Sequence, residues 1–300
     1  MVKVIDFQVI ANLMAGKGAG REILSDLKSF LEDNHKTYDV LAIEKPTPIS
    51  LLPGHNLTIG KGVICIGGDG TVSESVGYIL NKKLDLPLAI IPAGTANIIA
   101  SSFGMTGRER IFDFLLSNNY KKINVGLAEY GDKSEFFLLG FGLGFEENFL
   151  KMTKEKFKTK LGIFSYILTA LSELLSLKKI PLKISIDGKQ ISVAVCTLMA
   201  LNMPPKILKI FPLFKSKNSF ENDGILDLSY VEYRNFIHSV LGILALHVLG
   251  KFNFGTVKSF SGKEIYLQSD LIVGTQLDGE LKGNLPVRLS LLPNLFRFLV

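Results

Sequence analysis

An apolar run that ends in a glycine-rich turn constrains this chain more than any other stretch. Residues 64–71, ICIGGDGT, join a strand-like run to three glycines, a carboxylate and a hydroxyl. Helix-forming residues follow from 72 to 81, so the pattern predicts a strand, a tight turn and a helix start. Such a turn presents free backbone N–H groups and the positive end of a helix dipole, and both attract an anion. The turn is therefore predicted to bind a phosphate group.

A simpler alternative explains part of the same turn. Thr71 and Glu74 have the spacing of a capping box, in which two side chains satisfy the first N–H groups of a helix. A capping box does not require three glycines around an aspartate. We therefore favour the anion-binding interpretation.

Two further polar loops follow predicted strands in the first 120 residues. Strand-like runs lie at 7–11, 38–43, 62–66 and 86–91. They alternate with helical patterns, which is typical of a doubly wound, mostly parallel α/β sheet. The loops at 12–20 and 92–97 follow the first and last of these runs. Because ligands bind beyond the carboxyl ends of parallel strands, the three loops are predicted to meet at one edge.

After about residue 120 the pattern changes to short strands joined by turns. Strand-like runs lie at 123–130, 135–141, 182–186, 191–200, 225–231, 252–260, 264–268, 271–277 and 287–292. They predict a β-rich, antiparallel C-terminal domain, with helical patterns at 145–152 and 161–177. We expect domains at 1–122 and 123–289, with the closing segment near 290–300 returning to the first.

Composition narrows the classes of partner. A formal charge of +6 favours anionic partners, but the chain has no Arg-rich arm, zinc-ligand spacing or aromatic-basic ladder, so nucleic acid is not expected. The apolar segments 161–177 and 236–249 are too amphipathic or too short to be predicted as membrane spans. Cys65 and Cys196 lie in strand-like runs and are predicted to be buried, reduced thiols. A cytoplasmic setting follows as the expectation.

Taken in order, the motifs resemble the catalytic domain of the diacylglycerol kinase and sphingosine kinase superfamily, above all its bacterial soluble lipid kinases. The motifs are GGDGT at 67–71, PAGTANIIA at 92–100, the loop at 12–18, LG and SY at 161–166, NDGILD at 222–227, LDGE at 277–280 and LP at 292–293. The ordered set is far more specific than any one motif. The resemblance implies a two-domain lipid kinase with ATP in the cleft between the domains. It also implies a lipid substrate at a membrane surface and peripheral membrane contact.

The resemblance further implies roles for particular residues. The nucleotide phosphates would be bound by Asn12, Gly67, Gly68, Asp69, Gly70, Thr71, Val72, Ser73, Glu74 and Thr95. Asp278 would be the catalytic base that accepts the proton of the lipid hydroxyl, with Glu280 in support. Asp69 would make a metal-mediated contact with the reacting phosphates. A Mg²⁺ would be held by the Asp223 side chain and by the backbone carbonyls of Phe220 and Ile225, which are the oxygen ligands that Mg²⁺ prefers.

Several alternatives stay open. Asp278-Gly279 and Asp223-Gly224 are equally typical of hairpin turns, and Asp187-Gly188, which matches no family motif, is predicted to be only a turn. A NAD kinase-like enzyme shares GGDGT, and a catalytically silent lipid-binding module would keep the fold. The sequence does not name the lipid, and it leaves a homodimer open.

Other features bear on nucleotide and membrane contacts. Ile98 stands where the family often has an acidic residue, and Ile43 where it often has a hydroxyl, so the adenine and ribose contacts stay open. The lysine-rich stretch at 151–160 is typical of a solvated face, with docking on an anionic membrane as the alternative.

Overall fold

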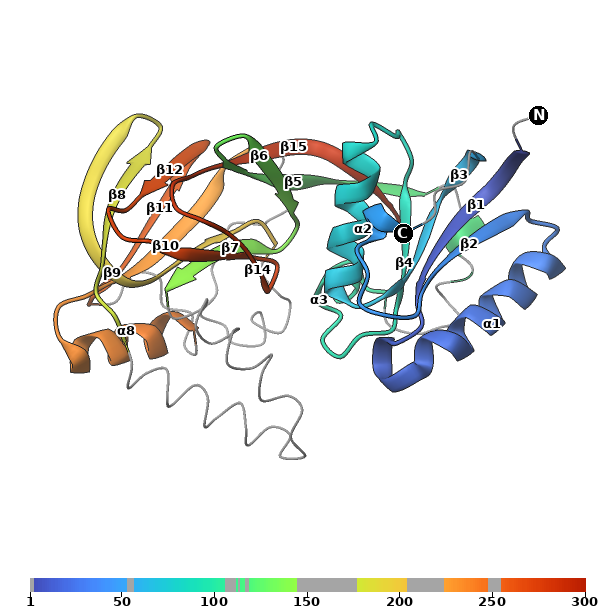
Figure 1. Ribbon diagram of the computed structural model, residues 1–300, viewed down its shortest axis with the longest axis horizontal. Helices are drawn as coiled ribbons and strands as arrows, with labels where there is room; N and C mark the ends of the chain where they lie inside the picture. The colour runs from blue at the N-terminus through green and yellow to red at the C-terminus, as the bar shows by residue number, and fades with distance from the viewer. Residues whose placement is uncertain are drawn as a thin grey trace. The chain divides into compact units, whose positions relative to one another are not determined.

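The computed structural model describes residues 3–52, 57–105, 112, 114–116, 119–144, 177–203, 224–247 and 255–300. The chain divides into two compact units, and the colours of Figure 1 follow it through both. Unit 1 comprises Met1–Asn124 and Asn294–Val300, and unit 2 comprises Val125–Pro293. Each unit is described by itself below.

Unit 1 is built around parallel strands in the order β4-β3-β1-β2. Its elements are β1 (Lys3–Asn12), η1 (Ala15–Gly18), α1 (Ala19–Asp33), β2 (Tyr38–Ile43), η2 (Ile49–Leu51), β3 (Leu57–Gly67), α2 (Asp69–Asn81), β4 (Leu88–Pro92) and α3 (Ile98–Ser102). The chain moves in one direction from β1 to β2 and in the other from β3 to β4. Right-handed crossovers then place α1 and α2 on opposite faces of the sheet, as Figure 1 shows.

The strand order reverses between β1 and β3, which makes that boundary a topological switch point. In sheets of this kind, ligands bind beyond the carboxyl ends of the strands at such a point. The doubly wound, parallel fold predicted for this part of the chain is confirmed.

The strands of unit 1 differ from the prediction mainly in length. β2 has the predicted bounds, whereas β1 and β3 begin earlier than expected because their first residues pair, with Lys3 opposite Leu57 and Ile5 opposite Ile59. The connection after β2 was predicted to have no strand before residue 62. It contains the short helical turn η2, but its last residues belong to β3.

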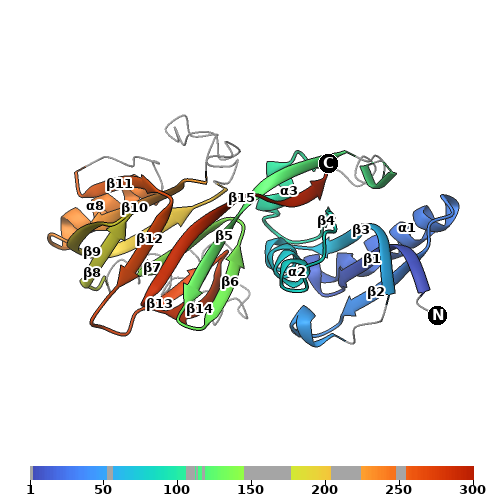
Figure 2. The ribbon, with the colours of Figure 1, turned by 90° about the horizontal axis from the view of Figure 1, so that it is seen from above.

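Unit 2 consists mainly of antiparallel strands. Its elements, with two strands that begin or end in unit 1, are β5 (Tyr120–Tyr130), β6 (Lys133–Phe137), β7 (Gly140–Gly144), β8 (Ile180–Ile186), β9 (Lys189–Leu201), β10 (Leu226–Glu232), α8 (Phe236–His247), β11 (Val257–Gly262), β12 (Glu264–Gln268), β13 (Gly274–Leu277), β14 (Glu280–Asn284) and β15 (Val287–Leu299). The main order is β14-β13-β7-β9-β8-β12-β15, with β10 on β9 and β11 on β10 (Figure 2). The predicted antiparallel, β-rich domain is confirmed.

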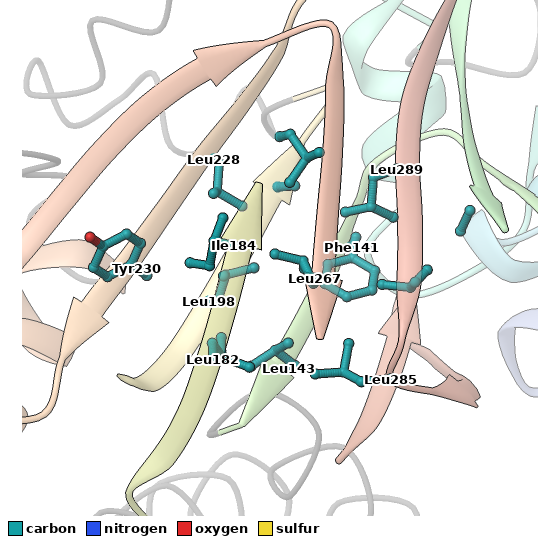
Figure 3. Packing of buried hydrophobic residues seen from close by; sticks show 14 of the residues in the cluster. Phe141, Leu143, Leu182, Ile184, Leu198, Leu228, Tyr230, Leu267, Leu285 and Leu289 are labelled. Carbon is teal, nitrogen blue, oxygen red and sulfur yellow. The ribbon is translucent and has the colours of Figure 1, made fainter. Parts of the chain in front are cut away.

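The core of unit 2 follows the two-residue period of its strands. In β8, Leu182, Ile184 and Ile186 point into the core while the residues between them are more exposed. Leu198 of β9 and Leu267 of β12 meet them from neighbouring strands (Figure 3). Burying each such leucine or isoleucine contributes about 1.5–3 kcal/mol to stability. This packing holds the turns at the strand ends in fixed positions.

Three predictions in the C-terminal half are corrected. The single strand expected at 135–141 is two strands, β6 and β7, and β14 was not predicted. β15 continues past Pro293 to Leu299, although its strand pattern was expected to end at 292. The helical pattern at 145–152 lies outside the described residues, as does the one at 161–177 except for Leu177. Within the part of the chain that the structure describes, no helix is long and apolar enough to cross a membrane.

Candidate functional site

The loop after β1 is tied to the glycine-rich turn after β3 by one side chain. Asn12 Nδ2 donates a hydrogen bond of 3.0 Å to Thr71 Oγ1, and Asn12 Oδ1 accepts one of 3.1 Å from the backbone N–H of Met14. Because Thr71 Oγ1 accepts from Asn12, its own hydroxyl proton is directed elsewhere and can be donated. Asn12 therefore fixes both its own loop and the orientation of the Thr71 hydroxyl.

Glycines let all three predicted loops approach one another closely. A Cβ atom on Gly94 would lie 2.5 Å from Gly68 Cα, and one on Gly16 would lie 2.5 Å from the carbonyl oxygen of Ala93. The backbone N–H of Ala93 also donates to the carbonyl oxygen of Gly67 at 2.9 Å. The prediction that these three loops meet at one edge of the sheet is confirmed.

The helix after the turn begins earlier than predicted, and no side chain caps its N-terminus. α2 begins at Asp69, with Gly68 in an extended conformation as its N-cap and no side-chain cap. Its first helical bond runs from Val72 N–H to Gly68 O at 3.0 Å. The capping-box alternative is wrong, because neither side chain caps α2. Thr71 Oγ1 accepts a hydrogen bond from Asn12, and Glu74 Oε1 accepts one of 2.6 Å from the backbone N–H of Ile49.

The start of α2 therefore has the features of an anion site. The N–H groups of residues 69–71 precede the first helical hydrogen bond, so they have no partner within the helix. They lie at the positive end of a helix of 13 residues. The Thr71 hydroxyl adds a side-chain donor at the same turn. Together these groups can bind the oxygens of a phosphate.

The loop after β4 is shaped by Asn97, whose role was not predicted. Asn97 has a positive φ of 48°, and its side chain closes the loop by accepting from Gly94 N–H at 2.9 Å and donating to Gly94 O at 2.8 Å. Asparagine tolerates this left-handed conformation better than most residues. In the sequence, the Gly-x-x-Asn spacing of Gly94 and Asn97 could have indicated this closed loop. Thr95, predicted to contact nucleotide, lies exposed within the closed loop.

Asp69 connects the glycine-rich turn to the next helix. Its Oδ1 atom accepts a hydrogen bond of 2.8 Å from the backbone N–H of Ile99, in the first turn of α3. The carboxylate thus caps α3 from outside that helix. The predicted role of Asp69 at the reacting phosphates is compatible with this tether, because a carboxylate has a second oxygen that can accept another contact.

Asp278 lies in unit 2, at the turn between β13 and β14. Asp278 and Gly279 both have positive φ values, 50° and 82°, so the hairpin-turn interpretation of this pair is correct for the backbone. The carboxylate accepts three backbone hydrogen bonds, from Leu138 N–H at 2.7 Å, Leu139 N–H at 2.7 Å and Gly140 N–H at 3.0 Å. Three donors stabilise the ionised carboxylate and hold the segment between β6 and β7.

Asp187-Gly188 forms a similar turn elsewhere in unit 2, between β8 and β9. Its φ values are 47° and 84°, and the prediction that this pair is a turn is confirmed. The Asp187 carboxylate accepts from Glu264 N–H at 2.9 Å and Lys263 N–H at 3.0 Å. Hydrogen bonds from Glu264 N–H and then Lys263 N–H hold the pKa of Asp187 below its ordinary value.

The remaining predicted residues are only partly described. Glu280 is exposed and lies 3.6 Å from Lys282 Nζ. Of the proposed metal ligands, Ile225 is described, whereas Phe220 and Asp223 lie outside the described residues. Among the residues that the structure describes, no group of three or more His, Cys, Asp or Glu side chains could hold a metal ion.

Comparison with protein families covers nearly the whole chain. Residues 6–128 match the model of the diacylglycerol kinase catalytic domain, and residues 144–300 match the model of the YegS C-terminal NAD kinase beta sandwich-like domain. The chain belongs to the diacylglycerol kinase catalytic-domain superfamily. The resemblance inferred from the ordered motifs is confirmed.

Several relatives of this diacylglycerol kinase superfamily member are known. A protein of Streptococcus pneumoniae named "Putative lipid kinase" is 26% identical over 284 residues, which cover 91% of this chain and 92% of that one. An uncharacterized protein of Synechocystis is 25% identical over 244 residues, which cover 77% of this chain but only 53% of the relative.

A solved structure shows the same fold. The crystal structure of a "putative diacylglycerol kinase" from Bacillus anthracis aligns with a TM-score of 0.70 at 21% identity, covering 98% of this chain and 96% of that one. At this identity the likeness establishes the fold alone. The two-domain α/β and β-rich architecture of the superfamily is therefore shared by this chain.

Proposed function

We propose that this chain is an ATP-dependent lipid kinase. It would transfer the γ-phosphate of ATP to a hydroxyl of a diacylglycerol-like, phosphatidylglycerol-like or sphingoid lipid. The observation that carries the proposal is the uncapped start of α2 at the switch point of the sheet, in contact with two other glycine-bearing loops. The lipid kinase name of the Streptococcus pneumoniae relative supports the choice of acceptor.

In this proposal the phosphates of ATP bind to unit 1. The backbone N–H groups of residues 69–71 bind phosphate oxygens, and the Thr71 hydroxyl, oriented by Asn12, donates to one of them. Asn12 and Gly67 to Glu74 thus form or support the phosphate site, and Thr95 borders it on the neighbouring loop. Little covalent chemistry is required of the protein, because phosphoryl transfer depends mainly on positioning and charge neutralisation.

Unit 2 would supply the groups for the acceptor. Asp278 takes the proton of the lipid hydroxyl, the hydroxyl oxygen bonds to the γ-phosphorus, and the bond to the β-phosphate oxygen breaks to release ADP. Glu280 is proposed to support the base. A Mg²⁺ would be held by the Asp223 carboxylate and by the carbonyl oxygens of Phe220 and Ile225, an oxygen donor set that suits this ion. When bound, it would neutralise negative charge near the site.

The direct test is lipid-dependent release of ADP. Purified protein, ATP and Mg²⁺ are mixed with micelles that carry each lipid class in turn, beside a known lipid kinase as the positive control. We expect ADP release with at least one lipid and none with micelles alone. Thr71→Val should weaken ATP binding, and Thr71→Ser should restore most of it. The proposal is wrong if no lipid stimulates ADP release while the control enzyme works.

A second candidate is a NAD kinase-like enzyme, because the C-terminal family model is described as NAD kinase beta sandwich-like. NAD-dependent ADP release without a response to lipid would favour it. A catalytically silent lipid-binding module is the third. Calorimetry that shows vesicle binding but no affinity for ATP would favour that module.

The lipid acceptor also suggests where the protein works. We propose a cytoplasmic protein that makes transient peripheral contact with a membrane. Co-sedimentation with vesicles tests this contact, and sedimentation velocity tests whether the chain forms a homodimer.

A further inference from the structure

Helix α8 of unit 2 carries three large apolar side chains on its outside. Phe236, Ile237 and Leu241 are 45%, 67% and 52% exposed. A helix on the surface of a globular protein normally turns such residues toward the core. The outer face of α8, defined here as these three side chains, is therefore an exposed apolar surface.

The inner face of α8 is already occupied, so the helix cannot bury its outer residues by rotating. α8 packs on β10 and β11 (Figure 2). Ser239 and Gly242 are buried there, and a Cβ atom on Gly242 would lie 2.4 Å from Thr256 Oγ1 and 2.5 Å from Val231 Cγ1. Ile243, Ala245 and Leu246 complete this inner face within a buried cluster. The close contacts of Gly242 and the burial of Ser239, Ile243 and Leu246 fix the orientation of the helix.

Basic residues flank α8 in the sequence, and the nearest acidic residue before the helix is Glu232. α8 itself contains no Asp, Glu, Lys or Arg. Between Glu232 and Glu264 the sequence has four lysine or arginine residues and no acidic one, and of the four Arg234 lies nearest to the start of α8 in the chain. Arg234 is half exposed and only loosely paired, 3.4 Å from Glu232. Lys178 and Lys179, both exposed, follow Leu177, which packs against the cluster beneath α8.

We propose that the outer face of α8 docks on an anionic lipid surface. Exposed apolar side chains would enter the interface between headgroups and acyl chains, and the exposed Arg234, Lys178 and Lys179 would bind anionic headgroups. A helix of 12 residues is about 18 Å long, too short to span a bilayer of about 30 Å, so it would lie flat. The proposal rests on the proposed lipid kinase function, because it gives the surface on which that enzyme meets its substrate.

The first experiment compares two pairs of charge substitutions in unit 2. I237D/L241D places two carboxylates on the outer face of α8. The control, L271D/I272D, places two on the connection between β12 and β13, where Leu271 and Ile272 are 53% and 91% exposed. Without ATP, each protein is sedimented with vesicles of equal parts phosphatidylglycerol and phosphatidylcholine. We expect binding to fall by about tenfold or more for I237D/L241D and by less than about twofold for the control.

The second experiment uses the absence of tryptophan from this chain. A tryptophan placed by Ile237→Trp is then the only one, and its emission should shift to the blue with the same vesicles and be quenched by brominated lipids. Ile272→Trp should show neither effect. High salt and vesicles of phosphatidylcholine alone should both weaken the response, because the basic residues contribute through screened charge.

Several outcomes would overturn the proposal. Failure of the wild type to bind anionic vesicles would contradict it, as would equally strong binding of the wild type to neutral vesicles. An equal loss of vesicle binding for I237D/L241D and L271D/I272D would contradict it too. Dissociation of a dimer by I237D/L241D without loss of vesicle binding would instead assign α8 to a second copy of the chain. Turnover of a monomeric short-chain lipid, which needs no membrane, separates the docking proposal from the lipid kinase proposal. I237D/L241D should retain this turnover if only docking is affected. Absence of the turnover in the wild type would contradict the kinase function.

Discussion

At the scale of single residues, unit 2 uses the same device twice. Asp187 and Asp278 each occupy the first position of an Asp-Gly turn with positive φ, and each carboxylate accepts backbone N–H groups from another segment. One of these turns matches a family motif and the other does not. The turn geometry therefore explains the residue type at both positions, and any catalytic role of Asp278 must come in addition to its hydrogen bonds.

Asp187 and Asp278 together allow a controlled test of the proposed catalytic base, Asp278. Asp278→Asn would place an amide N–H₂ near donors that now bond to the carboxylate, so it should destabilise the fold by about 1–3 kcal/mol. If Asp278 is the base, kcat should also fall by about 100-fold or more. Asp187→Asn should destabilise the fold but leave kcat of the folded fraction near the wild-type value. The measurement is kcat beside thermal unfolding, and similar kcat values for the two variants would remove Asp278 from the base role.

Two glycines of unit 1 should respond oppositely to the same substitution. Gly94→Ala would force its Cβ against the Gly68 backbone and separate the two loops, which should lower stability by about 1–3 kcal/mol and ATP affinity by about tenfold. A Cβ atom on Gly77, inside α2, would have no neighbouring atom within 4 Å. Gly77→Ala should therefore stabilise the helix by about 1 kcal/mol without changing ATP affinity. Urea unfolding and calorimetry with ATP measure both effects, and a tolerated Gly94→Ala would contradict the loop contact.

At the scale of elements, substitutions can separate the hydrogen bond of Asp69 to α3 from its proposed role at the phosphates. Asp69→Asn keeps an oxygen that can accept from Ile99 N–H, whereas Asp69→Ala removes it and should destabilise the protein by about 1–2 kcal/mol. If the charge acts at the phosphates, both variants should lose about 100-fold in kcat although only the alanine variant is unstable. An asparagine variant with wild-type kcat would leave Asp69 with the helix tether alone.

The elements also show what could be predicted from the sequence. The alternating apolar strands and the glycine loops identified the parallel sheet, because periodicity and turn residues are local signals. The start of α2 was missed by three residues, because Gly68 begins the helix with its backbone and offers no capping side chain to recognise. The strand pattern predicted for β15 stops at 292, before Pro293, which has no N–H to donate to a ladder. The chain continues there through Asn294, with a φ of 53°, whose N–H donates to Asn124 Oδ1.

Long-range pairings could not be predicted in the same way. Glu74 accepts from Ile49 N–H and so does not form the capping box that was the alternative interpretation. The three donors to the Asp278 carboxylate come from about 140 residues earlier in the chain. Neither contact leaves a periodic trace, because each depends on how distant segments fold together. The ordered motifs nevertheless identified the superfamily, since they are spread over nearly the whole length.

At the scale of the whole molecule, each unit has its own buried core and one cysteine. Cys65 lies in β3 of unit 1 and Cys196 in β9 of unit 2, and both are buried and free, as predicted. Burial raises the pKa of Cys65 to about 12 and that of Cys196 to about 11. Neither thiol is ionised at neutral pH, so each should react with a thiol reagent only after its surroundings open. The two cysteines are therefore separate reporters of the two units.

This arrangement gives a test of where ATP binds. ATP with Mg²⁺ at about 100 times its Kd should stabilise the unit that binds it by about 2.7 kcal/mol. In a urea series with pulsed thiol labelling and peptide mass spectrometry, the midpoint for Cys65 should therefore rise, while that for Cys196 should stay where it was. A rise for Cys196 alone would place the nucleotide in unit 2 and contradict the phosphate site at α2. A common rise for both would show that the units unfold together. Gly94→Ala, with about tenfold weaker ATP binding, should then reduce the stabilisation by ATP to about 1.4 kcal/mol, because ATP binding depends on the contact between Gly94 and Gly68.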